Sequence, residues 1–363
     1  MKRLLRSALA LGARRPRVLA FIDLVQDVDV MLPVLLALRE QGGIGLKIHV
    51  SRWLQRESPR TEVMLREHGL DFAYLPRRQV IEGRAPTLRG ADALIAAAES
   101  THPAHSAAHA LAQRAKAAGL KTYALQHGFE NVGLFGVETA AASFASDVVF
   151  CWFPKDAIPA ALSPGTRGKL AHVGRPGSVG AARAAESAFD VGVFENLHWD
   201  RYDDADRSNF LAGLTAAVRA LPQVRFLLRS HPAAGWADQF GHDLAQFANI
   251  SRDQAAMARG RPQGGADIIQ GLARVITTPS TVALDAAMAG VPVALAAAGG
   301  KLYDPLPLLR SPDDWIGFAA GGAFDRRTLD QFCSRVLVGG DGAVRIAERL
   351  RRDLMGASQH HHG

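Results

Sequence analysis

Residues 275–295 read "VITTPSTVALDAAMAGVPVAL" and contain an apolar strand, a polar turn, an alanine-rich helical stretch and a second apolar strand. A strand, a helix and a strand in this order form the repeating unit of a parallel sheet. Ser280 or Thr281 stands where the helix starts, and both residue types cap helix N-termini. The turn is therefore either a plain helix cap or an anion site, because a helix N-terminus presents unpaired N–H groups and a positive dipole end.

The same alternation extends over the rest of the chain in two halves. In the first half we expect strands at residues 17–23, 44–50, 70–76, 91–100, 120–128, 146–152 and 170–177, and helices at 31–42, 58–69 and 102–119. In the second half we expect strands at 191–200, 223–232 and twice within 275–295, and helices at 207–222, 329–337 and 343–355.

This pattern predicts an α/β fold of two doubly wound, Rossmann-like domains that face each other across a cleft. The first domain covers residues 1–177, and the second covers 191–363 with the last two helices closing it. The alanine-rich stretch 178–190 is expected to be the linker.

The composition is that of a folded protein with anionic partners. The 363 residues are 48% hydrophobic and 21% charged, and no apolar run reaches the roughly 18 residues that a membrane span needs. The net charge is +7, yet only 7% of the residues are aromatic and no nucleic-acid-binding motif is present. A phosphate-bearing small molecule or an anionic membrane surface is therefore favoured over nucleic acid. The two distant cysteines are expected to be reduced thiols in the cytoplasm.

Residues 2–15 are basic and contain a short apolar stretch, but Arg14 and Arg15 stand where a signal peptide would have its small-residue cleavage site. We interpret this segment either as a lead-in that rests on an anionic membrane or as a disordered terminus. The protein is accordingly expected in the cytoplasm, or peripherally at the inner face of the plasma membrane. The terminal "HHHG" is excluded from any metal site.

Four polar clusters directly follow predicted strands: "QHGFEN" (126–131), "FENLHWD" (194–200), "RSHP" (229–232) and "TTPST" (277–281). Ligands of doubly wound sheets bind beyond the carboxyl ends of the strands. An arginine offers a two-pronged fork to phosphate and a histidine ring donates from either nitrogen, although a lone strand-end histidine is also commonly structural. The donor-binding candidates of the second half are Glu195, Asn196, Arg229, Ser230, His231, Pro232, Thr278, Ser280 and Thr281.

The first half supplies candidates for catalysis and for acceptor binding. His127 closes a strand, and a histidine with a pKa near neutrality can act as a general base. Glu130 is the competing base, and the alternative is that His127 only anchors the turn. Asp23, Asp27 and Glu99 also follow strands and are predicted to bind acceptor hydroxyls, or to be ordinary loop acids.

Other kinds of site lack their defining residues. His102, His105 and His109 have a spacing that metal ligands can have, but no cysteine or carboxylate completes the set, so no metal site is predicted. The chain contains no "GxGxxG" after its first strand, no "GxxxxGK[ST]" and no "GxSxG". These absences count against a dinucleotide oxidoreductase, a P-loop NTPase and an α/β-hydrolase.

Taken together, "QHG" in the first half and "RSHP" and "TTPSTVALDAAMAGVPV" in the second resemble the GT-B glycosyltransferases. They are similar to the bacterial branch that includes CDP-glycerol glycerophosphotransferases and capsule or lipopolysaccharide transferases with an "HP" motif. The resemblance implies His127 as the catalytic base, and His231, Ser280 and Thr281 as ligands of the donor phosphate. It also places Asp285 near the nucleotide ribose or in the helix core.

The resemblance implies a metal-independent enzyme that needs no cofactor. It would move a sugar from a CMP-, CDP- or UDP-activated donor to a glycan or lipid-linked acceptor in bacterial surface polysaccharide biosynthesis. The glycerophosphotransferases carry an aspartate and paired serines in the hydroxyl turn and a tryptophan before "HG", where this chain has "TTPST" and Gln126. A polyol-phosphate transferase is therefore the alternative, a nucleotide-sugar 2-epimerase is a further one, and a non-enzymatic partner subunit with the same fold is the last.

Overall fold

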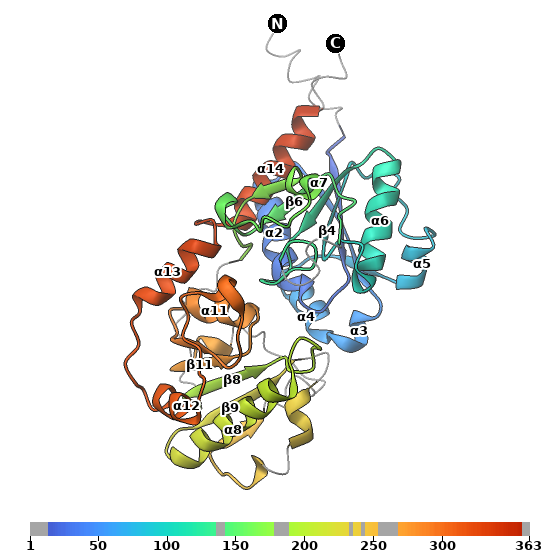
Figure 1. The fold of residues 1–363 in the computed structure, drawn as a ribbon. Helices are drawn as coiled ribbons and strands as arrows, with labels where there is room; N and C mark the ends of the chain where they lie inside the picture. Colours follow the sequence, from blue (N-terminus) through green and yellow to red (C-terminus); the bar gives the residue numbers. More distant parts are fainter. Residues whose placement is uncertain are drawn as a thin grey trace, which may run out of the picture. The chain divides into compact units, whose positions relative to one another are not determined.

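The computed structural model describes residues 14–135, 142–177, 189–231, 235–240, 244–252 and 268–357. The chain divides into two compact units (Figure 1). The first unit consists of Met1–His127, Asn131–Gly177 and Val338–Gly363, and the second of Gly128–Glu130 and Ser178–Leu337. The division falls after Gly177, next to the predicted linker, of which residues 178–188 lie outside the described residues.

The first unit is built on a parallel sheet of seven strands in the order β3-β2-β1-β4-β5-β6-β7. The strands are β1 (Arg17–Ile22), β2 (Gly45–Ser51), β3 (Phe72–Leu75), β4 (Ala93–Ala97), β5 (Lys121–Leu125), β6 (Val148–Cys151) and β7 (Leu170–His172). The order reverses between β1 and β4, which is the point where doubly wound sheets bind ligands at their carboxyl edge.

Helices lie beside this sheet (Figure 1). They are α2 (Asp27–Gln41), α3 (Leu54–Glu57), α4 (Pro59–Glu67), α5 (Arg77–Ile81), α6 (Ser106–Ala117), α7 (Pro164–Arg167) and α14 (Gly342–Ala357), with short 3-10 turns at Pro103–His105 and Lys155–Ala157. The small alanines of α6 pack closely on the apolar side chains of β1 and β4 in one buried cluster. Helix α2 starts four residues before its predicted start, because Pro33 lies inside the helix rather than in its first turn.

Helix α14 belongs to the first unit and not to the second, which differs from the domain bounds expected from the sequence. Its buried side chains include Ile346, Leu350 and Leu354, and the helix packs against α2. Tyr123 of β5 donates its hydroxyl proton to Asp353 Oδ2 at 2.9 Å. An amphipathic pattern shows that one face of a helix is buried, but not which sheet buries it.

The second unit contains a parallel sheet of five strands in the order β10-β9-β8-β11-β12. The strands are β8 (Val191–Glu195), β9 (Phe226–Ser230), β10 (Ile250–Arg252), β11 (Arg274–Thr277) and β12 (Val293–Leu295). Its described helices include α8 (Asp204–Ala220), α11 (Thr281–Met288), α12 (Pro312–Ala319) and α13 (Arg327–Val336), with 3-10 turns at Trp236–Phe240 and Gly300–Tyr303. The strand order reverses between β8 and β11, so this unit also has a switch point at its carboxyl edge.

Helices α8 and α12 pack closely because Gly213 leaves room for the indole of Trp315, which would collide with any Cβ at that position. Trp315 is buried and lies edge-to-face with Phe210 at 5.4 Å between ring centroids. Helix α8 begins three residues before its predicted start, since Asp203 and Asp206 form a capping box there. Among the described helices, none has the length and apolar character that a membrane crossing requires.

Candidate functional site

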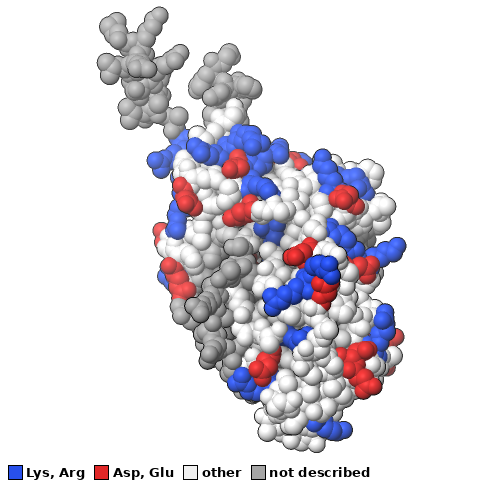
Figure 2. All heavy atoms as spheres, turned by 90° about the vertical axis from the view of Figure 1, so that its left-hand side faces the viewer, with Lys and Arg blue, Asp and Glu red and all other residues white. Residues whose placement is uncertain are grey.

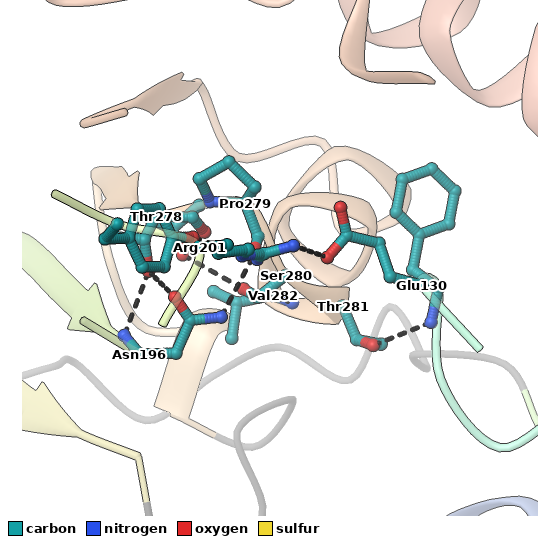
Figure 3. Close-up of polar contacts among 11 residues, drawn as sticks. Glu130, Asn196, Arg201, Thr278, Pro279, Ser280, Thr281 and Val282 are labelled. Atoms are coloured by element: carbon teal, nitrogen blue, oxygen red, sulfur yellow. Dashed lines mark hydrogen bonds and ion pairs between the residues drawn. The ribbon is translucent and has the colours of Figure 1, made fainter. Parts of the chain in front are cut away.

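The turn 277–281 is held by its own hydroxyl groups (Figure 3). Ser280 is the N-cap of α11, as predicted, and its Oγ accepts a hydrogen bond from the Val282 N–H at 3.3 Å. Thr277 Oγ1 donates to the Thr278 carbonyl at 2.8 Å and lies 3.2 Å from Ser280 Oγ. Since the Thr277 proton is already used, the Ser280 hydroxyl is the donor of that pair. The hydroxyl of Ser280 is thus committed to the turn itself.

The loop after β8 fixes the turn from the neighbouring strand. Thr278 Oγ1 donates to Asn196 Oδ1 at 2.6 Å and accepts from the Asn196 N–H at 3.0 Å. Asn196 Nδ2 donates to the Pro279 carbonyl at 3.0 Å. Glu195 accepts from the N–H groups of Leu197, at 2.8 Å, and Ala237, at 3.1 Å. These bonds favour a structural role for Glu195, Asn196 and Thr278, whose donor contacts stay predictions.

Arg201 is a functional candidate that the sequence reasoning missed. Its guanidinium forms an ion pair with Glu130 and donates to the Pro279 carbonyl at 2.6 Å and to the Tyr202 hydroxyl at 2.9 Å (Figure 3). The arginine thereby links the turn to the segment that follows His127. Because Glu130 is paired in this way, its position favours an anchoring role over that of a general base.

Thr281 differs from the other hydroxyl residues of the turn. Its Oγ1 accepts a hydrogen bond from the Phe129 N–H at 2.9 Å (Figure 3). No acceptor for the Thr281 hydroxyl proton is found in the described part of the chain, and the residue is half-buried at the first position of α11. Thr281 can therefore donate to an anion from the helix N-terminus, where the dipole also favours negative charge.

Replacing Ser280 with alanine removes the cap of α11. We expect a loss of about 0.5–2 kcal/mol in the free energy of unfolding of the second unit, because the Val282 N–H loses its acceptor. Urea unfolding of the variant and the wild-type protein measures this difference. Ser280→Asp is the matched control, since aspartate also caps helices, and an equal loss in that variant would contradict the capping role.

Strand β9 carries the second predicted cluster to the same edge of the sheet. Arg229 and Ser230 are the last two residues of β9 and pair with Phe194 and Glu195 of β8, and His231 follows them. All three are half-buried, and Pro232 lies outside the described residues. Because β8 separates β9 from β11, the strand ends that carry His231 and the turn are roughly 10 Å apart.

Three aromatic rings gather at the end of β9. The ring of His198 lies 4.8 Å from that of His231, and the half-exposed indole of Trp199 lies 6.2 Å from His231. Burial, and next the neighbouring His198, lowers the pKa of His231 from 6.5 to about 4. His231 is therefore neutral at pH 7, and a neutral imidazole carries one ring N–H.

Asp285 lies in the middle of α11 and is 7% exposed. The resemblance offered two places for this residue, near a nucleotide ribose or in the helix core. Its burial favours the helix core.

In the first unit, His127 follows β5 and contacts a second histidine. The rings of His127 and His105 lie edge-to-face, with 5.3 Å between their centroids. Ser100 Oγ lies 2.6 Å from His105 Nδ1, so the hydroxyl after β4 fixes the His105 ring. The backbone N–H of His127 donates to Asn131 Oδ1 at 3.0 Å. The His105 ring thus packs on the His127 ring, and Asn131 holds the His127 backbone.

One ring nitrogen of His127 makes no hydrogen bond to the described residues. Its Nδ1 is buried and has no hydrogen-bond partner among the described residues. Burial, and next the nearby His102, lowers the pKa of His127 from 6.5 to about 4. A neutral imidazole with an uncommitted nitrogen is the form that can accept a proton from an acceptor hydroxyl.

Two of the three predicted acceptor residues, Glu99 and Asp27, are bound by backbone N–H groups of the protein. Both carboxylate oxygens of Glu99 accept backbone N–H bonds, from Ala145 and Ser146 at 3.0 Å each, and His109 lies 2.5 Å from Oε1. Asp27 Oδ2 accepts from the N–H groups of Asp23 and Leu24, at 3.0 and 2.8 Å. These bonds favour anchoring roles for Glu99 and Asp27, whose acceptor contacts stay predictions.

Asp23 is the buried acid at the switch point of the first sheet. It is 1% exposed, and its Oδ1 lies 3.1 Å from Arg77 Nε. Burial raises the pKa of Asp23 although the charge of Arg77 opposes this shift. Arg77 also donates to the Ala104 carbonyl at 2.7 Å and lies over the ring of Trp53. Asp23 thus remains a candidate for binding a hydroxyl, with Arg77 as its partner.

The three histidines with metal-like spacing do not converge. His105 bonds to Ser100, and His109 bonds to Glu99. Within the described residues, no group of three or more histidine, cysteine, aspartate or glutamate side chains could hold a metal ion.

Solved structures resemble this chain over nearly its whole length. The S. aureus MnaA–UDP co-structure matches with a TM-score of 0.67 and 12% identity, covering 94% of this chain and 97% of that chain. UDP-GlcNAc 2-epimerase from Neisseria meningitidis, bound to UDP-GlcNAc, has a TM-score of 0.64 at 12% identity, covering 94% and 100%. The calicheamicin glycosyltransferase CalG4 has a TM-score of 0.55 at 13% identity, covering 95% and 100%.

At this level of identity, the similarity shows the fold alone. The chain has a GT-B-type fold with two Rossmann-like halves, so the fold class predicted from the sequence is confirmed. A scan against protein-family models finds no match, and a search of curated proteins finds none either.

Proposed function

We propose that the protein is a glycosyltransferase that moves a sugar from a nucleotide-activated donor to a hydroxyl of a glycan or lipid-linked acceptor. The observation that carries the proposal is the pair of sheet edges with complementary chemistry. The second unit presents anion-suited groups after β9 and β11, and the first unit presents a neutral histidine after β5. Both sets stand at carboxyl edges, where α/β sheets bind ligands.

The donor phosphates are assigned to the second unit. Arg229, His231 and Thr281 supply a guanidinium, a ring N–H and a hydroxyl, and the N-terminus of α11 adds its dipole. When the bond from sugar to phosphate breaks, negative charge collects on the leaving nucleotide. Fixed donors of this kind stabilise that charge without a metal ion.

The role of the base that removes the proton of the acceptor hydroxyl is assigned to His127. An acceptor hydroxyl must lose its proton as its oxygen attacks the anomeric carbon of the sugar. The Nδ1 of His127, which has no hydrogen-bond partner among the described residues, can take that proton, because the ring is neutral and packs edge-to-face on His105. Of the predicted acceptor contacts, Asp23 is the best placed, since it follows β1 at the switch point of the first sheet and pairs there with Arg77.

A nucleotide-sugar 2-epimerase is the second candidate. The fold similarity to UDP-GlcNAc 2-epimerases favours it. An epimerase would need free carboxylates in its site. Glu99, Glu130 and Glu195 are instead bound by the protein's own groups, which argues against this candidate. Conversion of UDP-GlcNAc without any acceptor would identify an epimerase, whereas a transferase consumes donor at a useful rate only with its acceptor.

A polyol-phosphate transferase remains the alternative within the transferases. That enzyme would leave a phosphodiester in the product and release a nucleoside monophosphate from a CDP donor. A sugar transferase would leave a glycosidic bond. Mass spectrometry of the product distinguishes the two.

Calorimetry with UDP, CDP, CMP and UDP-GlcNAc tests the donor site. We expect at least one of these to bind, and His231→Ala to weaken that binding by about 10- to 100-fold, since a hydrogen bond to a charged group contributes about 1.5–3 kcal/mol. His68→Ala is the control, because His68 is exposed in the first unit. The proposal is wrong if none of the four binds, or if His231→Ala binds as tightly as the wild type.

A further inference from the structure

The net positive charge of the protein comes entirely from the first unit. Counted over the sequence, the first unit has 27 lysines and arginines against 17 acidic residues, a net charge of +10. The second unit has 15 against 18, a net charge of −3. The excess charge therefore does not lie on the unit that is proposed to bind the anionic donor. The excess of basic residues on the first unit therefore indicates a second anionic partner, other than the donor.

The described basic residues of the first unit concentrate at the amino edge of its sheet. In a parallel sheet, the strand starts and the carboxyl ends of the helices between them lie at one edge. Arg17 and Lys121 start β1 and β5, Arg39 lies in the last turn of α2, and Lys116 in the last turn of α6. We call this surface the amino-edge face and define it by Arg14, Arg15, Arg17, Arg39, Arg89, Lys116, Lys121, Arg351 and Arg352, all of them exposed.

These residues are neighbours in space. The guanidinium groups of Arg14 and Arg17 both lie close to Gly90, and Arg14 Nη1 donates to the Gly90 carbonyl at 2.6 Å. Arg15 and Arg39 line one hollow of about 300 Å³, together with Gly42, Gly43 and Ile44. A side chain at Gly43 would meet the exposed Met355, which lies near the end of α14, the helix that carries Arg351 and Arg352. Figure 2 shows basic side chains gathered at the end of the first unit drawn uppermost.

Acidic residues offset only part of this charge. Asp92 pairs with Arg14, Asp147 pairs with Lys116, and Asp71 lies in the hollow beside Arg15. Glu40 and Glu67 are also exposed at this edge, in the last turns of α2 and α4. No acidic residue occurs in the sequence before Asp23, while six basic residues occur there. The face is thus basic and broad, and it carries the apolar Met355. None of the residues that define it is aromatic, and Phe72, at the start of β3, is half-buried with the Arg66 guanidinium over its ring.

We propose that the amino-edge face of the first unit docks the protein on an anionic lipid bilayer. Several basic side chains spread over a wide face match a surface of many negative head groups better than they match one small ligand. The lack of aromatic stacking groups on the face disfavours single-stranded nucleic acid.

Docking by this face has a consequence for the acceptor, which rests on the proposed function. Strand β2 has seven residues and is therefore roughly 20 Å long, and its ends mark the amino and carboxyl edges of the sheet. A docked first unit holds His127 and Asp23 at the far edge from the lipid. The reacting hydroxyl then belongs to a glycan that extends from the membrane, and not to a sugar attached directly to the lipid phosphate.

Co-sedimentation with vesicles tests the docking face, without donor or acceptor present. We expect the full chain to bind vesicles of phosphatidylcholine with phosphatidylglycerol, and not phosphatidylcholine alone. Arg15→Glu/Arg352→Glu should weaken binding by at least about 25-fold, since each basic side chain near such a surface contributes about fivefold. Raising the salt from about 0.1 M to about 1 M should also release the protein, because the Debye length falls to about 3 Å.

Arg310→Glu/Arg326→Glu is the matched control, with the same charge change on two exposed arginines of the second unit. It should bind like the wild type. Equal loss in both double variants, binding to neutral vesicles, or tighter binding to RNA than to anionic vesicles would overturn the inference. Because nucleotide calorimetry is a separate measurement, a failure here leaves the donor site untouched, and a failed donor test leaves the docking result standing.

Discussion

Replacing His127 with glutamine is expected to lower the rate of sugar transfer by about 10²- to 10⁴-fold, the range that a positioned general base contributes. Glutamine is polar and similar in length but cannot accept the proton of an alcohol. Donor affinity should not change, because the groups assigned to the donor belong to the second unit. Steady-state rates and nucleotide calorimetry on the same preparation measure the two effects separately.

The pH dependence of the transfer rate provides a second, independent test of His127 as the base. Since burial lowers its pKa to about 4, the ring is unprotonated, and active as a base, at every pH above that value. The rate of the wild type should therefore stay level from about pH 8 down to about pH 5 and fall below that, as the ring takes up a proton. A fall centred near pH 6.5 would contradict the buried, neutral state of His127.

His68→Gln is the control for the rate measurement. His68 is an exposed histidine of the same unit, with its Nδ1 2.8 Å from the Met64 carbonyl. An equal loss of rate in this variant, or a His127→Gln variant with full activity, would refute the role of His127 as base.

Replacing Phe129 with alanine is expected to cost about 3–5 kcal/mol of stability, the range for removing a buried phenylalanine. Phe129 is fully buried in the second unit. Its ring centroid lies 5.2 Å from that of Tyr303 and 5.6 Å from that of Phe332, both edge-to-face. The segment Gly128–Glu130 is thus anchored by an aromatic cluster, in addition to the bonds that Thr281 and Arg201 make to it.

Hydrogen exchange measured by mass spectrometry shows which elements lose stability in Phe129→Ala. Peptides from α11 and α13 should exchange faster in Phe129→Ala, while peptides from β1 and β4 should keep their protection, because they belong to the other unit. Phe129→Leu keeps most of the apolar volume and should cost less. Unchanged exchange in α11 and α13 would show that Phe129 is not an anchor of the second unit.

Most strands could be predicted because their apolar runs are local patterns, whereas β10, α5 and α12 were not predicted. Ser280, one of the two residues predicted at the cap, became the cap of α11, since a cap involves only the next two residues of the chain. The polar clusters after the strands were predicted for the same reason. A parallel topology then brings the ends of β8, β9 and β11 to one edge of the second sheet.

The partners of the polar side chains could not be predicted in this way. Arg201 appears in the sequence as one charge among several in "HWDRYDDAD", and only the fold pairs it with Glu130, 71 residues earlier. Glu99 and Glu195 looked available for a ligand, but backbone N–H groups from distant segments occupy them. A buried carboxylate needs such partners, and sequence spacing does not show which groups supply them.

The α/β class, the two halves, the candidate ligand edges and the surplus of basic residues could all be read from the amino-acid sequence, because each follows from composition or from short-range periodicity. Only the tertiary structure decided that α14 returns to the first unit and that His127 lies against His105. It alone gathered the basic residues at one edge of the first sheet. These features arise from contacts between segments far apart in the chain, whose free energy comes from burial and pairing that no local pattern records.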